Sequence, residues 1–176
     1  MSNAKGSMEL LRTALEMEKK GKAFYDKAGA TCKNKLGQEI FTMLAKDEVV
    51  HLERIKKIYE TLESQSKWTD EWMKIREAHA PINTLFKDLA LRHKTTSKAD
   101  ASDLEALDVG IDLETKSVAF YENQLKQATD VMEKKFAEKM IGEEKSHRAV
   151  LIDTKSYLEN PAAYFVEMER PDFDRG

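Results

Sequence analysis

Two short motifs pair a glutamate with a histidine three residues later: Glu48 with His51, and Glu144 with His147. On an α-helix, residues three apart share one face, so each carboxylate would project in the same direction as its imidazole. Carboxylate oxygens combined with imidazole nitrogens suit iron or manganese, whereas softer ions prefer thiolates. Each motif is therefore interpreted as one half of a metal site.

An internal repeat relates the two motifs. A shift of 96 residues superimposes them and also places Glu18 on Glu114 and Tyr25 on Tyr121. Each of these two glutamates precedes its tyrosine by seven residues, roughly two helical turns, so both lie on a stripe of apolar residues. A carboxylate that faces a core is costly unless it is paired or binds a cation. The repeat therefore selects Glu18 and Glu114 from the many glutamates of the chain.

These positions together predict a site for two metal ions, because two divalent cations would remove the repulsion among four core-facing carboxylates. One glutamate from each of two helices and Glu-x-x-His from each of two others is the ligand set of di-iron and di-manganese bundles. We expect two iron ions, with manganese or zinc as substitutes. Tyr25 and Tyr121 are core aromatics whose hydroxyls could bond a ligand carboxylate or relay an electron, which makes them candidate catalytic residues. The predicted metal ligands are Glu18, Glu48, His51, Glu114, Glu144 and His147.

Other charged residues near the motifs are open to two interpretations. Asp47 and Glu143 adjoin the motif glutamates and align across the repeat. Each of them either hydrogen-bonds a ligand histidine or lies on a solvated helix face. Glu16 points away from the predicted site and is expected at the surface. His79 and His93 lack a glutamate three residues earlier, so we expect them at the surface or between helices.

Four long segments with a helical apolar period must position these side chains. They span about residues 8–31, 34–62, 102–125 and 130–158. Ser102 with Glu105 predicts a capping box at the start of the third segment, and Asp130 opens the fourth in the same way. Pro161 follows the fourth segment, where a proline stops helix propagation.

The connection between the second and third segments, residues 63–101, is far longer than the usual connection of about 2–8 residues between bundle helices. Short helices are expected within it, after Pro81 and around Trp68 and Trp72. Two short connections that flank one long crossover predict an all-α, ferritin-like four-helix bundle, in which the second and third helices run parallel.

The length of 176 residues suits one domain. We expect residues 1–7 (MSNAKGS) to be an added leader, with Met8 as the natural start, and residues 8–160 to form the bundle. The tail, residues 161–176, contains Tyr164, Phe165 and Phe173 among charged residues, and we expect it to pack onto the bundle or a neighbouring subunit.

The composition argues against several classes of partner. The formal net charge is −3 and the two signs are interleaved, so no basic block predicts binding to nucleic acid or to a membrane surface. No apolar stretch approaches the ~20 residues of a spanning helix, and no signal peptide is recognised. The single cysteine, Cys32, is expected to be buried and cannot form an intramolecular disulfide or a four-thiolate site. We therefore expect a reducing compartment, the cytoplasm.

The sequence resembles the rubrerythrin branch of the ferritin-like superfamily. The resemblance implies a bridged di-iron centre that reacts with hydrogen peroxide or dioxygen, often in a homodimer. It also implies that the six predicted ligands hold the irons, with Glu48 and Glu144 as bridges. The matching stretches are residues 14–25 (ALEMEKKGKAFY), 44–51 (LAKDEVVH), 112–121 (DLETKSVAFY) and 142–147 (GEEKSH).

Two departures from the family pattern shape the functional hypotheses. Rubrerythrins proper carry a rubredoxin module with four iron-binding cysteines, which a single cysteine excludes, so electrons would come from a separate donor such as a rubredoxin-type protein. An additional carboxylate on the third helix is replaced here by Ser117. The leading hypothesis is a non-haem di-iron oxidoreductase, a peroxidase of rubrerythrin type that reduces hydrogen peroxide or dioxygen. The alternatives are an iron-binding ferroxidase for iron handling and a structural metal-binding bundle.

Overall fold

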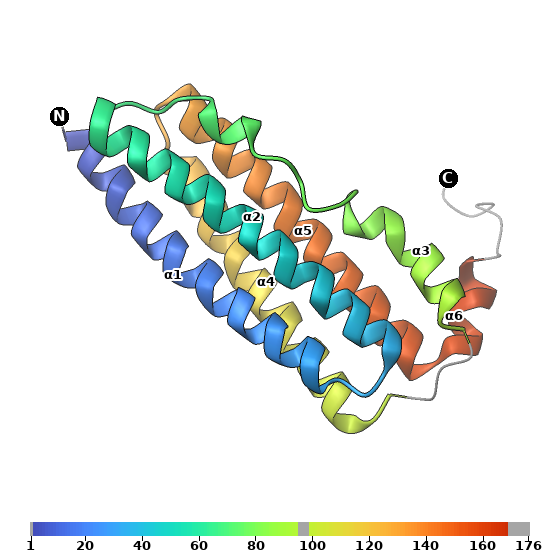
Figure 1. Cartoon of the computed structure of the whole chain (residues 1–176). Helices are drawn as coiled ribbons and strands as arrows, with labels where there is room; N and C mark the ends of the chain where they lie inside the picture. The colour runs from blue at the N-terminus through green and yellow to red at the C-terminus, as the bar shows by residue number, and fades with distance from the viewer. Residues whose placement is uncertain (1, 95–98, 169–176) are drawn as a thin grey trace.

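The computed structural model describes residues 2–94 and 99–168, and within these ranges the chain is helical and contains no strand (Figure 1). This architecture confirms the predicted all-α bundle. Phe173 and the side chain of Phe165 lie outside what the structure describes. The elements are α1 (Ser2–Thr31), α2 (Lys35–Gln65), η1 (Glu71–Lys74), α3 (Ile82–Arg92), α4 (Ala101–Gln127), α5 (Val131–Glu159) and α6 (Pro161–Met168).

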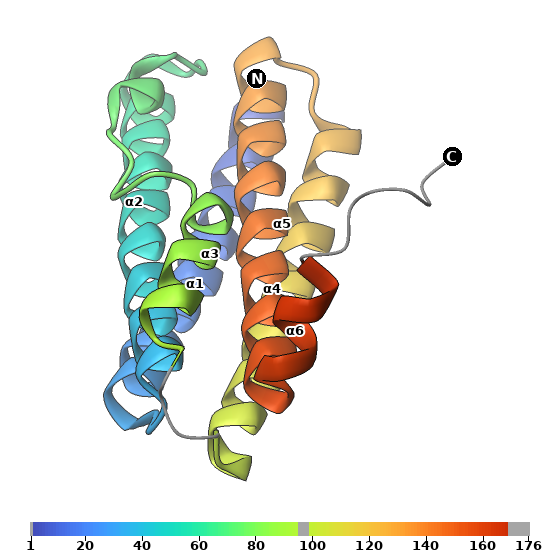
Figure 2. The same cartoon turned by 90° about the vertical axis from the view of Figure 1, so that its right-hand side faces the viewer.

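The four long helices form the bundle in two antiparallel pairs, α1 with α2 and α4 with α5. Short turns join the helices of each pair. The long crossover returns the chain along the whole bundle before α4 begins, so α2 and α4 run in the same direction (Figure 1). In Figure 2 the crossover helix α3 lies beside α2 and α5, and α6 lies against α5.

Side-chain caps fix where three of the long helices begin. The Asn34 side-chain oxygen accepts hydrogen bonds from the first turn of α2, and Asp130 accepts from the first turn of α5 as predicted. At α4 the predicted Ser102 cap is wrong. Asp100 is the cap and accepts from the Asp103 backbone N–H at 3.1 Å, while the Ser102 hydroxyl donates to the same Asp100 carboxylate at 2.5 Å. Because α4 begins at Ala101, Ser102 lies inside the first turn and cannot be the cap.

The helix α1 begins at Ser2, ahead of the predicted start at Met8. Residues 2–7 therefore continue the first helix, and Ser7 is buried. Its hydroxyl donates to Glu133 on α5 at 3.3 Å and accepts from the Trp68 ring N–H at 3.4 Å. The interpretation of residues 1–7 as an added leader stays a prediction.

The bundle core consists of two apolar clusters. One contains Tyr25, Leu44, Leu107 and Val150, and the other contains Leu11, Ile55, Tyr121 and Met140. On each long helix, one of the predicted site glutamates falls between a member of the first cluster and a member of the second. A polar layer therefore crosses the bundle between two apolar halves that hold the helices together.

Two outer segments cover the bundle. The Tyr164 ring of α6 meets the Phe86 ring of α3 and the Tyr157 ring of α5 edge-on, with centroid separations of 5.7 and 5.6 Å. On the opposite end of the crossover, Trp68 and Trp72 pack around Phe136 of α5. In the part of the chain that the structure describes, no helix combines the length and the apolarity needed to cross a membrane.

The carboxylate of Asp103 connects the α1–α2 turn to α4, because it accepts from the backbone N–H groups of Lys33 at 2.9 Å and Asn34 at 3.0 Å. We predict that Asp103→Ala lowers the free energy of unfolding by about 1–3 kcal/mol, since two backbone donors lose their acceptor. Urea unfolding followed by circular dichroism measures the loss. The control is Asp108→Ala, which removes an exposed pair with Lys155 and should change stability by less than about 0.5 kcal/mol. Equal losses in both variants would contradict the prediction.

Candidate metal centre

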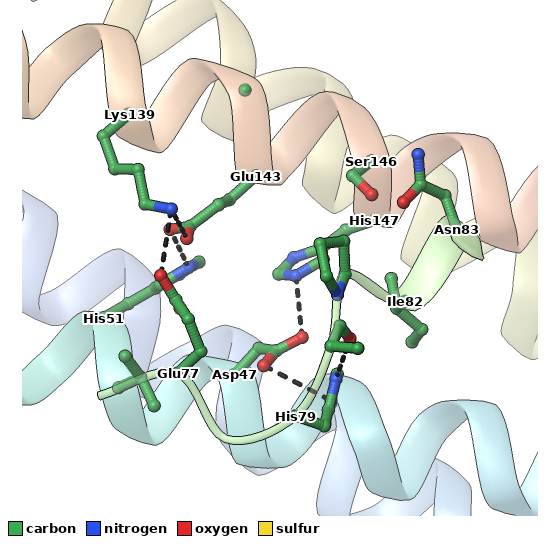
Figure 3. A pocket seen from close by; sticks show the side chains of 14 residues that line it. Asp47, His51, Glu77, His79, Ile82, Asn83, Lys139, Glu143, Ser146 and His147 are labelled. Atoms are coloured by element: carbon green, nitrogen blue, oxygen red, sulfur yellow. Dashed lines mark hydrogen bonds and ion pairs between the residues drawn. The ribbon is translucent and has the colours of Figure 1, made fainter. Parts of the chain in front are cut away.

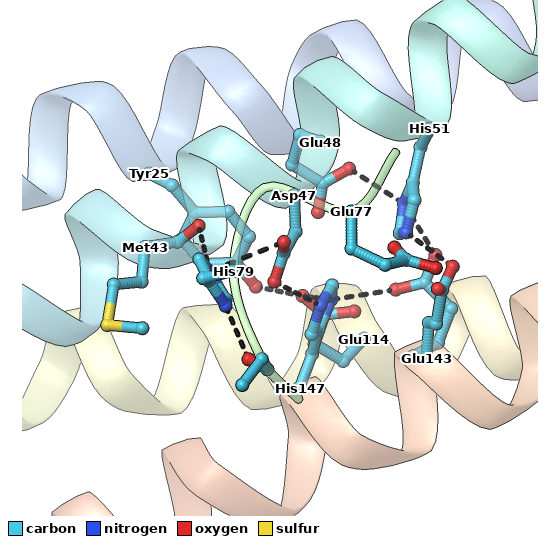
Figure 4. Close-up of polar contacts among 12 residues, drawn as sticks. Tyr25, Met43, Asp47, Glu48, His51, Glu77, His79, Glu114, Glu143 and His147 are labelled. Carbon is cyan, nitrogen blue, oxygen red and sulfur yellow. Dashed lines mark hydrogen bonds and ion pairs between the residues drawn. The ribbon is translucent and has the colours of Figure 1, made fainter. Parts of the chain in front are cut away.

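Four glutamates from four different helices meet in the polar layer: Glu18 of α1, Glu48 of α2, Glu114 of α4 and Glu144 of α5. Each is at most 3% exposed. The two motif histidines, His51 and His147, are buried at the same level of the bundle and lie among these carboxylates (Figure 4). The structure therefore brings together all six residues that the repeat selected.

The six side chains form two overlapping groups whose oxygen and nitrogen atoms lie within 4.8 Å of one another. Glu144 is common to both groups, which is the position expected of a bridging carboxylate. Glu48 belongs to the group with His147, and one of its oxygens is also 3.5 Å from His51 Nδ1. The groups are Glu48, Glu114, Glu144 and His147, and Glu18, His51 and Glu144.

Each core tyrosine hydrogen-bonds a glutamate of the opposite repeat half. The Tyr25 hydroxyl donates to Glu114, and the Tyr121 hydroxyl donates to Glu18 at 2.5 Å. Burial raises the pKa of both tyrosines well above the ordinary value, and the carboxylate that each one contacts raises it further. Both hydroxyls therefore keep their protons and orient the glutamates as neutral donors.

The outer edge of each histidine contacts a carboxylate from the facing helix. His51 Nε2 lies 3.2 Å from Glu143 of α5, and His147 Nε2 lies 3.2 Å from Asp47 of α2. A carboxylate only accepts, so each Nε2 carries a proton and each Nδ1 faces the buried glutamates. Of the two interpretations of Asp47 and Glu143, the structure supports the hydrogen bond to a histidine over a solvated helix face.

The pKa values of the four glutamates show that these side chains do not all ionise together. Burial, followed by repulsion from Glu18, raises the pKa of Glu48 well above the ordinary value. Burial and repulsion from Glu144 do the same for Glu114. Burial and repulsion from Glu18 raise the pKa of Glu144 to about 7. Burial also disfavours charge on Glu18, but its hydrogen bond with Glu48 and the charge of His51 outweigh this and lower its pKa to about 2.

The residues present fit metal ions. Both carboxylate oxygens of Glu144, one oxygen of Glu48 and Nδ1 of His147 are buried and make no hydrogen bond within the described residues. A buried polar atom without a partner costs about 1–3 kcal/mol. Divalent cations would satisfy these atoms and neutralise the carboxylates, and a donor set of oxygens and imidazoles without sulfur suits iron, manganese or zinc.

Three residues around the site were not selected from the sequence. Arg54 is 2% exposed and donates to Glu143 at 2.6 Å, and it also contacts Glu77 of the crossover at 2.7 Å. His79, which we expected at the surface or in a connection, lies in the crossover with Nε2 at 3.3 Å from Asp47. The only sequence signal is that Arg54 follows His51 by three residues and so shares its helix face.

The other residues considered from the sequence lie apart from the site. Glu16 is exposed and pairs with Lys19. His93 pairs with Glu39 at 2.6 Å. Cys32 is buried, as expected.

A small pocket of about 30 Å³ lies between α1 and α4, against the tyrosine side of the site. Gly21 and Ser117, which align across the repeat, both line it together with Glu48 and Glu114. At Gly21 an added Cβ would lie 3.4 Å from the Glu48 carboxylate carbon. This pocket has room for about one water-sized molecule.

The sequence model of the rubrerythrin family matches residues 9–155, which include nearly all of the four long helices and the whole buried cluster. The chain belongs to the rubrerythrin family. Comparisons with curated proteins and with solved structures returned no match. Membership of the rubrerythrin family agrees with a helical bundle that surrounds buried carboxylates and histidines.

Because Glu144 belongs to both groups, we predict that Glu144→Ala lowers metal content from two ions per chain to less than one. Glu18→Ala removes a ligand of one group and should leave about one ion. Metal analysis of protein loaded without chelators measures the content. Glu138→Ala, on the exposed face of α5, is the control and should bind as the unchanged protein does. If Glu144→Ala still binds two ions per chain, Glu144 is not a ligand that both metal positions share.

Metal loading should depend on pH. The raised pKa values of Glu48, Glu114 and Glu144 mean that the metal-free site holds protons near neutral pH, and metal ions must displace them. Apparent affinity should therefore fall as the pH falls, by about tenfold per pH unit for each proton released. Zinc titrations at several values between about pH 6 and 8 test this, with released protons measured by an indicator dye. An affinity independent of pH would contradict it.

Proposed function

We propose that this chain is a non-haem di-iron oxidoreductase that reduces hydrogen peroxide or dioxygen. The observation that supports the proposal is the buried set of four carboxylates and two histidines, in which several atoms lack a partner that a cation would supply. Membership of the rubrerythrin family supports the same proposal. In it, Glu18, Glu48, His51, Glu114, Glu144 and His147 hold two irons, with Glu144 as a bridge.

The bound irons would polarise the oxidant and supply one electron each. The protein's own contribution is to hold protons beside the reaction. Tyr25 and Tyr121 keep their protons on hydroxyls that contact Glu114 and Glu18, so each can donate a proton or an electron next to a ligand. We propose both tyrosines as catalytic residues on this basis.

The size of the pocket between α1 and α4 supports a small oxidant. A volume of about 30 Å³ suits a small molecule such as peroxide or dioxygen better than an organic substrate. Gly21 contributes to this room because it places no side chain beside the Glu48 carboxylate. We propose that the oxidant reaches the metals from this side, opposite the histidines.

The bound irons would need a source of electrons to return to the ferrous state. The only cysteine of the chain is Cys32, so no second iron centre with thiolate ligands is available within it. We propose a separate donor such as a rubredoxin-type protein, in the reducing environment of the cytoplasm.

Iron handling is the second candidate function. Ser117 stands one turn after Glu114 and lines the small pocket, where the family resemblance leads us to expect an additional carboxylate. A site with one carboxylate fewer holds ferric iron less firmly, which favours release of the ferric ion once it has formed.

Anaerobic titration with ferrous iron, followed by peroxide or by oxygen, separates the candidates. The oxidoreductase takes up two irons, and peroxide then produces a ferric absorption band while an equivalent of peroxide is consumed. Uptake of many irons per chain with oxygen as the better oxidant supports iron handling. If protein purified without chelators contains zinc alone and does not bind ferrous iron, both proposals fail and a structural bundle remains.

The tyrosines provide a sharper test of the catalytic roles. We predict that Tyr25→Phe and Tyr121→Phe each keep two irons but slow ferric band formation with peroxide by about 10- to 100-fold. Stopped-flow absorbance measures the rate. Tyr59→Phe removes a hydroxyl that bonds Arg12 at the surface and is the matched control. Unchanged rates in both core variants would refute their catalytic role.

A further inference from the structure

The outer side of the site is a pocket of about 300 Å³ between α2, α5 and the crossover. Both His51 and His147 line it, and each points its Nε2 toward a carboxylate (Figure 3). The two carboxylates, Glu143 and Asp47, are related by the repeat. Their surroundings differ, and this difference distinguishes the two halves of the site.

Two cations surround Glu143. Arg54 contacts one of its oxygens at 2.6 Å and Lys139 contacts the other at 2.9 Å. Glu77 of the crossover holds both cations in place, at 2.7 Å from Arg54 and 2.9 Å from Lys139. The negative charge that Glu143 presents to His51 is therefore largely neutralised.

Asp47 has no such neighbours. Its ion pairs within the described residues are with His147 and, at 3.3 Å, with His79 of the crossover; no arginine or lysine pairs with it. The repeat explains the contrast, because Arg54 aligns with Val150 and Lys139 aligns with Met43. Each of the two cations therefore has an uncharged counterpart at its repeat-related position.

A carboxylate that accepts a proton-donating bond from a ligand histidine makes the other ring nitrogen a stronger electron donor. Asp47 should therefore raise the electron-donating strength of His147 Nδ1. The neutralised Glu143 should raise that of His51 Nδ1 by less. The inner glutamates do not add to this difference, because carboxylate oxygens lie close to Nδ1 of both histidines, within 3.5 Å at His51 and within 3.8 Å at His147. The contrast between the outer carboxylates therefore favours a cation beside His147.

We propose that the two metal positions are unequal: the position at His147 binds first and tightly, and the position at His51 binds second and exchanges its ion more readily. The proposal rests on the proposed two-metal function. Two crossover residues act as positioning residues for this difference: Glu77, which contacts both cations, and His79, which contacts Asp47.

A titration with Mn²⁺ alone, followed by electron paramagnetic resonance, tests the proposal in the full chain. The first equivalent should give the signal of an isolated ion, and the second should convert it to the signal of a coupled pair. The two affinities should differ by at least about tenfold. Coupled pairs that appear from the start of the titration would overturn the proposal.

Variants of the two histidines assign the positions. His51→Ala should retain one Mn²⁺ with the affinity of the first step, whereas His147→Ala should lose that tight step. The opposite outcome, or equal losses in the two variants, would overturn the assignment. Thermal unfolding of the metal-free variants shows that each is folded.

The outer residues are tested by a matched pair of substitutions at repeat-related positions. Asp47→Asn should weaken the first step about 10- to 100-fold, and Glu143→Gln should weaken the second. Lys139→Met copies the residue found in the other repeat half and should tighten the second step alone. Lys145→Met is its control, because Lys145 is an exposed cation of the same helix that pairs with Glu122. If neither Asp47→Asn nor Lys139→Met changes the affinity of either Mn²⁺ binding step, the role of the outer residues is overturned.

The outcomes separate this inference from the proposed function. If the unchanged protein binds two Mn²⁺ ions with equal affinity, the metal site stands and the inequality fails. If it binds no Mn²⁺ and no ferrous iron, the proposed function itself fails.

Discussion

Four glutamates lie in the middle of an apolar bundle, where charges interact more strongly than they do in water. Their mutual repulsion must be balanced by protons, histidines or cations, because burial alone already disfavours the ionised form. The other features of the site follow from this requirement. The tyrosine hydroxyls, the two histidines and the outer carboxylates all hold a proton or a charge at a fixed place beside one of the four glutamates.

The fold meets this requirement by dividing its core. Apolar clusters on both sides of the polar layer stabilise the helices, so the glutamates need not contribute to stability themselves. Each long helix supplies one glutamate, and the parallel course of α2 and α4 gives the two repeat halves equivalent places around the site. The crossover then breaks that equivalence, because it places Glu77 at the cations beside Glu143 and His79 beside Asp47.

Much of this arrangement could be predicted from the sequence, since it depends on local spacing. The three-residue interval within each Glu-x-x-His motif and the repeat identify residues on one helix face, and the long connection indicates the crossover. Contacts between distant segments could not be predicted in this way. Arg54 reaches Glu143 from the facing helix α2, and His79 reaches Asp47 from a crossover whose path has no periodic pattern. Asp100 replaced Ser102 as the cap because α4 begins at Ala101, ahead of the start that the sequence pattern predicted.

The central claim is that the buried cluster binds two metal ions that share Glu144. Anomalous X-ray diffraction at the iron edge, from crystals grown anaerobically with ferrous iron, tests this claim most directly. The account predicts two peaks inside the bundle, one beside His51 and one beside His147, with the Glu144 carboxylate between them. A single peak, peaks at surface carboxylates, or no peak within the polar layer would contradict it.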